Sequence, residues 1–263
     1  MLASTVITMQ DNSAHGEDSF LSKDLGNGEF LDVVMDGVTG HGGEQASTEL
    51  RDALDAGDLN SAEDIVQLLS EMNEDFYSVG SGRFLLTTVS AVLGRDDQVQ
   101  IVSAGDSPVF LINKDGHQKL SGHAGGFLHV GVAKAIGASE QFIQPAQVEI
   151  TPSPGDRLLL ATDGITDNMT IEELAEVVRN AETPEAAAST IEDTIKERLQ
   201  DVIDTERKGI EDRLRDAREQ LEHAGDDSEF LQGPMKILED RAQQATEKLD
   251  NLPESSAGQI KEL

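Results

Sequence analysis

The chain has 263 residues, and its 51 Asp and Glu against 20 Lys and Arg give a formal net charge of −31. A surface this negative repels nucleic-acid backbones and anionic membranes, so the composition excludes both as partners. The absence of cysteine excludes disulfides, zinc–thiolate sites, iron–sulfur clusters and thiol nucleophiles. Any metal should therefore be oxygen-ligated Mg2+ or Mn2+.

The N-terminal residues do not form a targeting or membrane segment by sequence. Residues 1–9 lack the basic start and the long apolar centre of a signal peptide. No stretch of the sequence is apolar over the length that a transmembrane helix needs. Together with the absence of disulfides, these features lead us to expect a cytoplasmic protein.

Hydrophobic periodicity predicts an α+β fold. We expect strands at residues 3–9, 30–35, 85–93, 99–104, 108–113, 148–151 and 157–162, with the last two paired across the turn at 152–156. Two amphipathic helices are expected at 43–56 and 61–77, the second started by Ser61 and Asp64 as a capping box. A glycine- and histidine-rich loop should occupy 122–135. Short turns between strands favour antiparallel sheets flanked by helices.

After residue 170 the sequence pattern changes from strand-like runs to one in which helix signals dominate. A narrow apolar stripe predicts a helical hairpin or coiled-coil arm over residues 190–252. The alternative is a helical layer of the main domain. We therefore expect a first domain at 1–185 and a helical extension at 186–263. Residues 190–252 are the candidate surface for a protein partner or for self-association.

Several apolar runs end in an aspartate beside a glycine. Residues 31–35 lead to Asp36, residues 157–162 lead to Asp163, and residues 98–104 lead to Asp106. Each could be an ordinary turn between strands. Three such ends together with the acidic pair Glu17-Asp18 favour a carboxylate-rich metal centre, because aspartates supply hard oxygen ligands and glycines let the backbone approach a bound group.

With these residues in view, the chain resembles the metal-dependent Ser/Thr protein phosphatase (PPM) family. The motifs that carry the resemblance span residues 3–180 in the family's order. They are Gly16-Glu17-Asp18-Ser19, Asp36-Gly37-Val38-Thr39-Gly40-His41, Leu86-Thr87-Thr88, Gly105-Asp106-Ser107, Ala135-Ile136-Gly137 and Thr162-Asp163-Gly164-Ile165-Thr166-Asp167. The resemblance implies a PPM-type β-sandwich of mainly antiparallel strands in α-β-β-α layers.

The resemblance also implies a site with two Mn2+ or Mg2+ ions. Asp36 would bridge both ions and the Gly37 carbonyl would bind one of them, while Asp163, Glu17 and Asp18 would complete the cluster. A metal-activated water would then hydrolyse phosphomonoesters of a phosphoprotein substrate, with no covalent enzyme intermediate. Asp36 and Asp163 are the principal catalytic candidates.

Three further roles remain open. His41 could protonate the leaving alkoxide, or it could pack its loop against the sheet. Asp106 could bind an extra metal ion, or it could be a structural cap at its strand end. Thr87 and Thr88 are expected in the β-core, with their hydroxyls bonded to nearby backbone.

The sequence departs from the family pattern at several positions. Ser13 stands where the family has a phosphate-gripping arginine, Thr39 replaces a loop glycine, and Pro108 replaces an arginine. No equivalent of the family's closing Asp-Asn pair and final strand is evident after residue 180. These departures keep an alternative open, in which the protein is a phosphatase-like pseudoenzyme or scaffold that binds partners through its helical tail.

Overall fold

The computed structural model describes residues 17–78, 85–121, 135–223, 236 and 259–262. Its strands are β1 (Ser19–Gly26), β2 (Glu29–Met35), β3 (Val89–Arg95), β4 (Gln98–Ala104), β5 (Val109–Asn113), β6 (Gly116–Ser121), β7 (Ala146–Ile150), β8 (Arg157–Leu160) and β9 (Gln259–Glu262). Its helices are α1 (Gly43–Ala56), α2 (Ala62–Ser78), α3 (Asp163–Thr166), α4 (Ile171–Asn180) and α5 (Pro184–His223). The strand predicted at residues 3–9 and most of the loop predicted at 122–135 lie outside the described residues.

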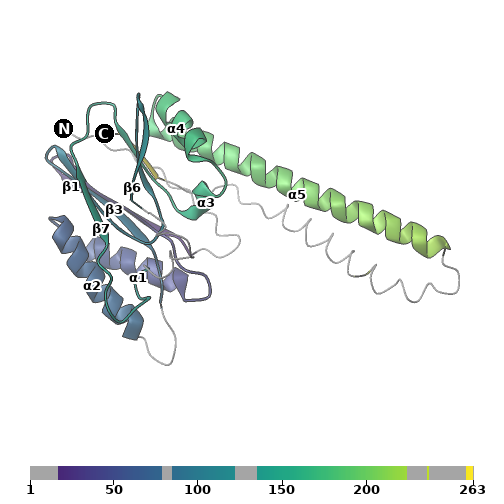
Figure 1. The fold of residues 1–263 in the computed structure, drawn as a ribbon, viewed down its shortest axis with the longest axis horizontal. Coiled ribbons are helices and arrows are strands. Elements are labelled where there is room, and N and C mark those ends of the chain that lie inside the picture. Colours follow the sequence, from purple (N-terminus) through teal and green to yellow (C-terminus); the bar gives the residue numbers. More distant parts are fainter. Residues whose placement is uncertain (1–16, 79–84, 122–134, 224–235, 237–258, 263) are drawn as a thin grey trace. The chain divides into compact units, whose positions relative to one another are not determined.

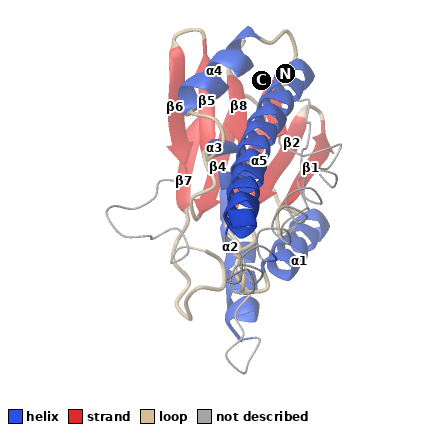
Figure 2. Ribbon diagram, turned by 90° about the vertical axis from the view of Figure 1, so that its right-hand side faces the viewer, coloured by secondary structure: helices blue, strands red, loops and turns tan. Residues whose placement is uncertain are grey.

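The strands form two antiparallel sheets. One sheet has the order β1-β2-β3-β4-β7 and the other has the order β6-β5-β8-β9. Helices α1 and α2 lie on one side of the strands and α4 lies on the other (Figures 1 and 2). This arrangement confirms the predicted α+β sandwich flanked by helices.

Strand β2 shows how the sequence builds this sandwich, because its side chains alternate between two apolar cores. Leu31, Val33 and Met35 belong to the core shared with α1 and α2. Phe30 and Val34 belong to a second core that joins the two sheets and includes side chains from β5 and β8. A strand buried on both faces is mostly apolar in sequence, and residues 30–35 are apolar except for the buried Asp32.

Local signals account for several of the first turns and helices, although β1 was not among the predicted strands. The hairpin between β1 and β2 turns at Asn27 and Gly28, whose φ angles of 57° and 84° suit the tight turn that these residue types favour. Helix α1 matches the predicted 43–56. Helix α2 begins after Ser61, whose hydroxyl accepts from the Asp64 N–H at 3.2 Å, while the Asp64 carboxylate accepts from the Asn60 N–H at 2.9 Å. The predicted cap by Ser61 is therefore present, but the reciprocal bond to the Asp64 carboxylate comes from the N–H of Asn60 rather than of Ser61.

Two strand predictions were wrong. Residues 148–151 and 157–162 were expected to pair with each other, but β7 pairs with β4 in one sheet and β8 pairs with β5 in the other. The turn at 152–156 therefore crosses between sheets. The strand predicted at 85–93 begins only at Val89, and the preceding residues make isolated bridges through Thr87.

A third correction concerns the final strand, which sequence reasoning did not find. Strand β9 pairs antiparallel with β8, from Arg157 opposite Glu262 to Leu160 opposite Gln259. Strand β6 was also missed, since only the turn at its start was predicted and residues 117–121 were left unassigned. Both have few apolar residues in alternation, so neither carries a strong period-two signal.

The chain divides into two compact units, one of residues 1–192 with 255–263 and the other of residues 193–254. The final strand of the first unit thus follows the whole of the second unit in the sequence. Helix α5 confirms helix over the first part of the predicted 190–252 hairpin. Apart from Lys236, which is helical, the second predicted helix lies outside the described residues, and the predicted division at residue 185 stays a prediction. Among the described helices, none has the length and apolarity to cross a membrane.

We expect β9 to stabilise the first unit although it lies far along the sequence from β8, the strand with which it pairs. Ending the chain before Gln259 should remove the backbone hydrogen bonds of four paired residues and lower the free energy of unfolding by about 2 to 5 kcal/mol. Urea unfolding followed by circular dichroism measures this change. A chain shortened by Leu263 alone is the control, and equal unfolding midpoints for the two truncations would contradict the role of β9.

Candidate functional site

Four aspartates lie where strands end or begin at one edge of the sandwich. Asp36 directly follows β2, and Asp18 directly precedes β1, whose Ser19 is opposite Met35 in the register. Asp106 lies between β4 and β5, and Asp163 is the first residue of α3, after β8. Since neighbouring strands are antiparallel, these ends lie together although they are distant in sequence.

The backbone of Asp36 is fixed by two threonines. Its N–H donates to the Thr88 hydroxyl at 3.2 Å, and its carbonyl accepts from the Thr88 N–H at 2.8 Å and from the Thr87 hydroxyl at 3.0 Å. The Thr88 hydroxyl also pairs with that of Ser107 at 2.7 Å. The expected role of Thr87 and Thr88 is confirmed, and their bonds leave the Asp36 carboxyl free to face the other acids.

Hydrogen bonds also hold the segment that carries Glu17 and Asp18 close to Asp36 and to the end of β8. The Glu17 carbonyl accepts from the Gly37 N–H at 3.1 Å and from the buried Ser47 hydroxyl at 2.6 Å. The Thr162 hydroxyl donates to the Asp18 carboxylate at 2.8 Å, across 144 residues of sequence. Sequence reasoning missed Ser47 and the Thr162 contact, since nothing in a helical serine or a strand-end threonine signals a long-range partner.

Two glycines make this close packing possible. A Cβ on Gly37 would lie 2.4 Å from the backbone of Gly43 and 2.5 Å from the Glu17 carbonyl oxygen. A Cβ on Gly43 would lie equally close to Gly37. The glycine-rich sequence after β2 is thus required where the turn at Gly37 meets the start of α1.

The four aspartates interact electrostatically. Burial, reinforced by the charges of Asp18, Asp163 and Asp106, raises the pKa of Asp36 to about 8. Burial also raises the pKa of Asp18, although the Thr162 hydrogen bond opposes the shift. The pKa of Asp163 is raised by burial and then by the charges of Asp167 and Asp106. These mutual effects on the pKa values indicate that the aspartates predicted from the sequence lie near one another.

This acidic cluster has the chemistry of a cation site. The charges of Asp18 and Asp163 both raise the pKa of Asp36, so a proton held on Asp36 relieves repulsion among three carboxyl groups. A divalent cation could replace that proton and neutralise more of the charge. As the side chains lie, no three His, Asp or Glu residues within the described part of the chain are spaced to hold a metal ion. The donor types fit a metal, and the carboxylates would have to move closer together to coordinate one.

The remaining predicted site residues lie beside this cluster. The Glu17 carboxylate accepts from the Thr39 hydroxyl, and its charge raises the pKa of Asp18. Gly37 forms a bridge with Thr87. The side chain of His41 is exposed, while its backbone accepts from the Leu86 N–H at 3.2 Å and holds the loop in place. The proposed proton-donor role of His41 stays a prediction.

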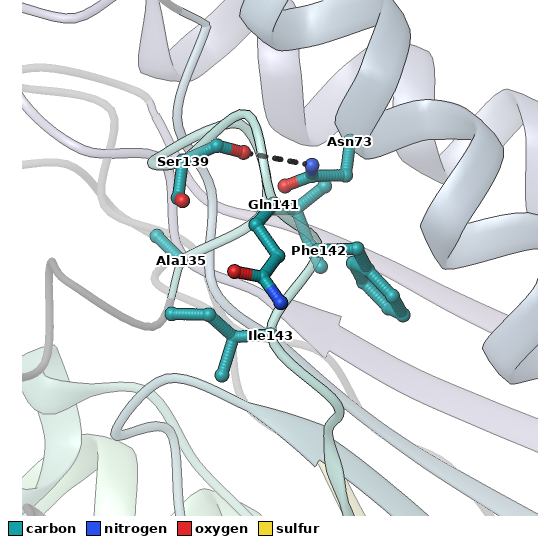
Figure 3. Close-up of a pocket in the computed structure, with 7 residues that line it drawn as sticks. Asn73, Ala135, Ser139, Gln141, Phe142 and Ile143 are labelled. Carbon is teal, nitrogen blue, oxygen red and sulfur yellow. Dashed lines mark hydrogen bonds between the residues drawn. The ribbon is translucent and has the colours of Figure 1, made fainter.

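A shallow surface hollow, too small to hold a ligand, lies beside the segment that bridges to Thr87, as Figure 3 shows. Its one fully buried polar side chain, Asn73, is already satisfied. The Asn73 amide donates to the Ser139 carbonyl at 3.0 Å and accepts from the Gly137 N–H at 2.9 Å. The hollow therefore offers no free buried group to a ligand, and Asn73 serves to hold the chain around Gly137.

Comparison with solved structures finds bacterial phosphatases with this fold. PppA of Pseudomonas aeruginosa, described as a key regulatory component of T6SS, is 23% identical with a TM-score of 0.59, covering 72% of this chain and 88% of that one. Serine/threonine phosphatase Stp1 from Staphylococcus aureus is 20% identical (TM-score 0.61; 78% and 90% covered). The catalytic domain of the phosphatase PstP, in complex with 2 manganese ions, is 20% identical (0.60; 74% and 91%).

The fold is therefore the one that these bacterial phosphatases share, as the motif resemblance implied. The family described as Stage II sporulation protein E (SpoIIE) matches residues 28–219, and the chain belongs to this family. Among curated protein sequences, none matches this chain significantly.

Proposed function

We propose that this protein is a metal-dependent phosphatase that hydrolyses phosphoserine and phosphothreonine in a protein substrate. The observation that carries the proposal is the convergence of Asp18, Asp36 and Asp163 on one edge of the sandwich, with a pKa of about 8 at Asp36. A proton bound this tightly among carboxylates marks a place where positive charge is stabilised. Structural likeness to bacterial serine/threonine phosphatases supports the same activity.

In this proposal the chain's own groups have distinct tasks. Asp36, Asp18 and Asp163 would be carboxylate ligands of Mn2+ or Mg2+, with the Gly37 carbonyl beside them and Glu17 next to Asp18. When bound, the ions would supply a water of lowered pKa and neutralise charge on the phosphoryl oxygens. Thr87, Thr88 and Thr162 position the ligands through the hydrogen bonds given above. His41, on the exposed loop after Gly37, would donate a proton to the leaving alkoxide.

The direct test is release of inorganic phosphate from a phosphoserine or phosphothreonine peptide by the full chain, with and without Mn2+. We expect turnover with Mn2+ and none in EDTA. Absence of turnover in the presence of Mn2+, or Mg2+, would contradict the proposal. If calorimetry then also showed no Mn2+ binding, the scaffold hypothesis would be favoured.

A further inference from the structure

Within residues 17–192, the basic residues that the structure describes are few, and most are engaged in structural contacts. Residues 17–192, as far as the structure describes them, contain seven: Lys23, Arg51, Arg95, Lys114, Lys119, Arg157 and Arg179. Five of these bind structural partners. Lys23, Arg157 and Arg179 donate to backbone carbonyls, namely those of Asp55, of Val178 and Ala181, and of Asn113 respectively. Arg51 forms an ion pair with Asp52, and Arg95 forms one with Glu29. Two lysines remain.

These two lysines lie at opposite ends of one hairpin. Lys114 is in the turn between β5 and β6, where Asn113 pairs with Gly116. Lys119 lies near the other end, opposite Phe110, with its Nζ 6.0 Å from the centre of the Phe110 ring. The contact of an ammonium with an aromatic face holds Lys119 over β5 rather than leaving it extended in solvent.

The end that carries Lys119 is also the end that carries the acidic cluster. Val109 is opposite Ser121 on one side and opposite Leu160 on the other. Asp106 precedes Val109 by three residues, and Asp163 follows Leu160 by three. A register shift between Val109 and Phe110 bends the hairpin here, and such bulges re-aim side chains at sheet ends.

Lys119 interacts with the cluster without being neutralised by it. The charge of Asp106 acts on Lys119 and also on Asp36 and Asp163, so the lysine and the other acids are all within electrostatic reach of Asp106. In the described residues no hydrogen bond or ion pair engages the Lys119 ammonium. Its three donors therefore remain available at the rim of the cluster.

We propose that Lys119 binds the phosphoryl group of the substrate at the edge of the acidic cluster. This inference rests on the proposed function. A phosphate dianion that approaches four aspartates is repelled by them. A cation at the rim offsets that repulsion and orients the phosphoryl oxygens toward the carboxylate-lined site, as a lysine does for phosphates elsewhere. Because this contact is made to the bound phosphate, its loss should weaken substrate and product binding more than it slows turnover.

The test compares Lys119→Ala, Lys119→Arg and the control Lys114→Ala in the full chain with Mn2+. For Lys119→Ala we expect the KM for p-nitrophenyl phosphate and the inhibition constant of inorganic phosphate to rise about tenfold or more, the usual effect of losing a charged hydrogen bond. Lys119→Arg should recover most of the binding because it keeps the charge. Lys114→Ala should match the wild type, since Lys114 lies at the far end of the hairpin.

Two further measurements separate this inference from a structural role and from the proposed function. Lys119→Ala should keep the wild-type melting temperature and Mn2+ affinity; a parallel loss of either would assign Lys119 a structural role and overturn the inference. If the wild type hydrolyses nothing, the proposed function fails. Calorimetric titration of inorganic phosphate in excess Mn2+ then still tests whether Lys119 binds phosphate. Equal phosphate affinity in wild type and Lys119→Ala, or no binding in either, would overturn the inference.

Discussion

Replacing Asp36 with asparagine should lower Mn2+-dependent hydrolysis of p-nitrophenyl phosphate by about a thousandfold or more, because it removes the carboxylate at the centre of the proposed ligand set. Asparagine has nearly the same shape, so the hydrogen bond from the Thr87 hydroxyl to the residue-36 carbonyl and the one from the residue-36 N–H to the Thr88 hydroxyl should persist. Steady-state turnover with saturating Mn2+ measures the effect.

The control for this variant is Asp97→Asn, which alters an exposed acid in the turn between β3 and β4. It should leave turnover unchanged. The Asp36→Asn protein should also be at least as stable as the wild type without metal, which separates lost chemistry from lost folding. Turnover by Asp36→Asn at the wild-type level would remove Asp36 from the mechanism.

Metal-free protein should become less stable as the pH rises from about 4 to 8. The folded state raises the pKa of Asp36 from its usual 3.8 to about 8, so between these values the folded protein binds a proton that the unfolded chain releases. Stability falls with pH wherever the folded state holds more protons. An isolated shift of this size corresponds to about 6 kcal/mol, and sharing of the proton within a partly hydrated cluster reduces the expected loss to about 2 to 4 kcal/mol.

Urea unfolding in EDTA at pH 5 and pH 8 measures this loss. Asp36→Asn should flatten the dependence, whereas Asp97→Asn should retain it. Excess Mn2+ should stabilise the wild type more at pH 8 than at pH 5, since at low pH the cation competes with the proton. A wild type that is equally stable at both pH values in EDTA, or an Asp36→Asn variant with the full loss, would contradict the clustered carboxylates.

Elements specified by neighbouring residues could be predicted from the sequence, and elements specified by distant partners could not. The Asn27-Gly28 turn and the Ser61–Asp64 cap each depend on a few adjacent residues. The separation of β7 and β8 into different sheets depends on β4 and β5. Strand β9 depends on β8, which lies about a hundred residues earlier, and its own four residues carry no period that would reveal it.

The same distinction holds for the candidate site. The pattern of an aspartate beside a glycine at the end of an apolar run could be recognised in the sequence. The structure places the three aspartates found in this way, Asp36, Asp163 and Asp106, in one electrostatic cluster. The groups that hold the cluster were not visible. Ser47 and Thr162 act through contacts across 30 and 144 residues, and Lys119 reaches the site through strand pairing.

The most direct test of the account is a crystal structure of the protein soaked in Mn2+, with the ions located by anomalous scattering. We predict two ions among Asp18, Asp36 and Asp163, with Asp36 in contact with both. Fully occupied Mn2+ elsewhere, with Asp36 and Asp163 bound to no ion, would contradict the proposal that these strand-end aspartates form the metal centre.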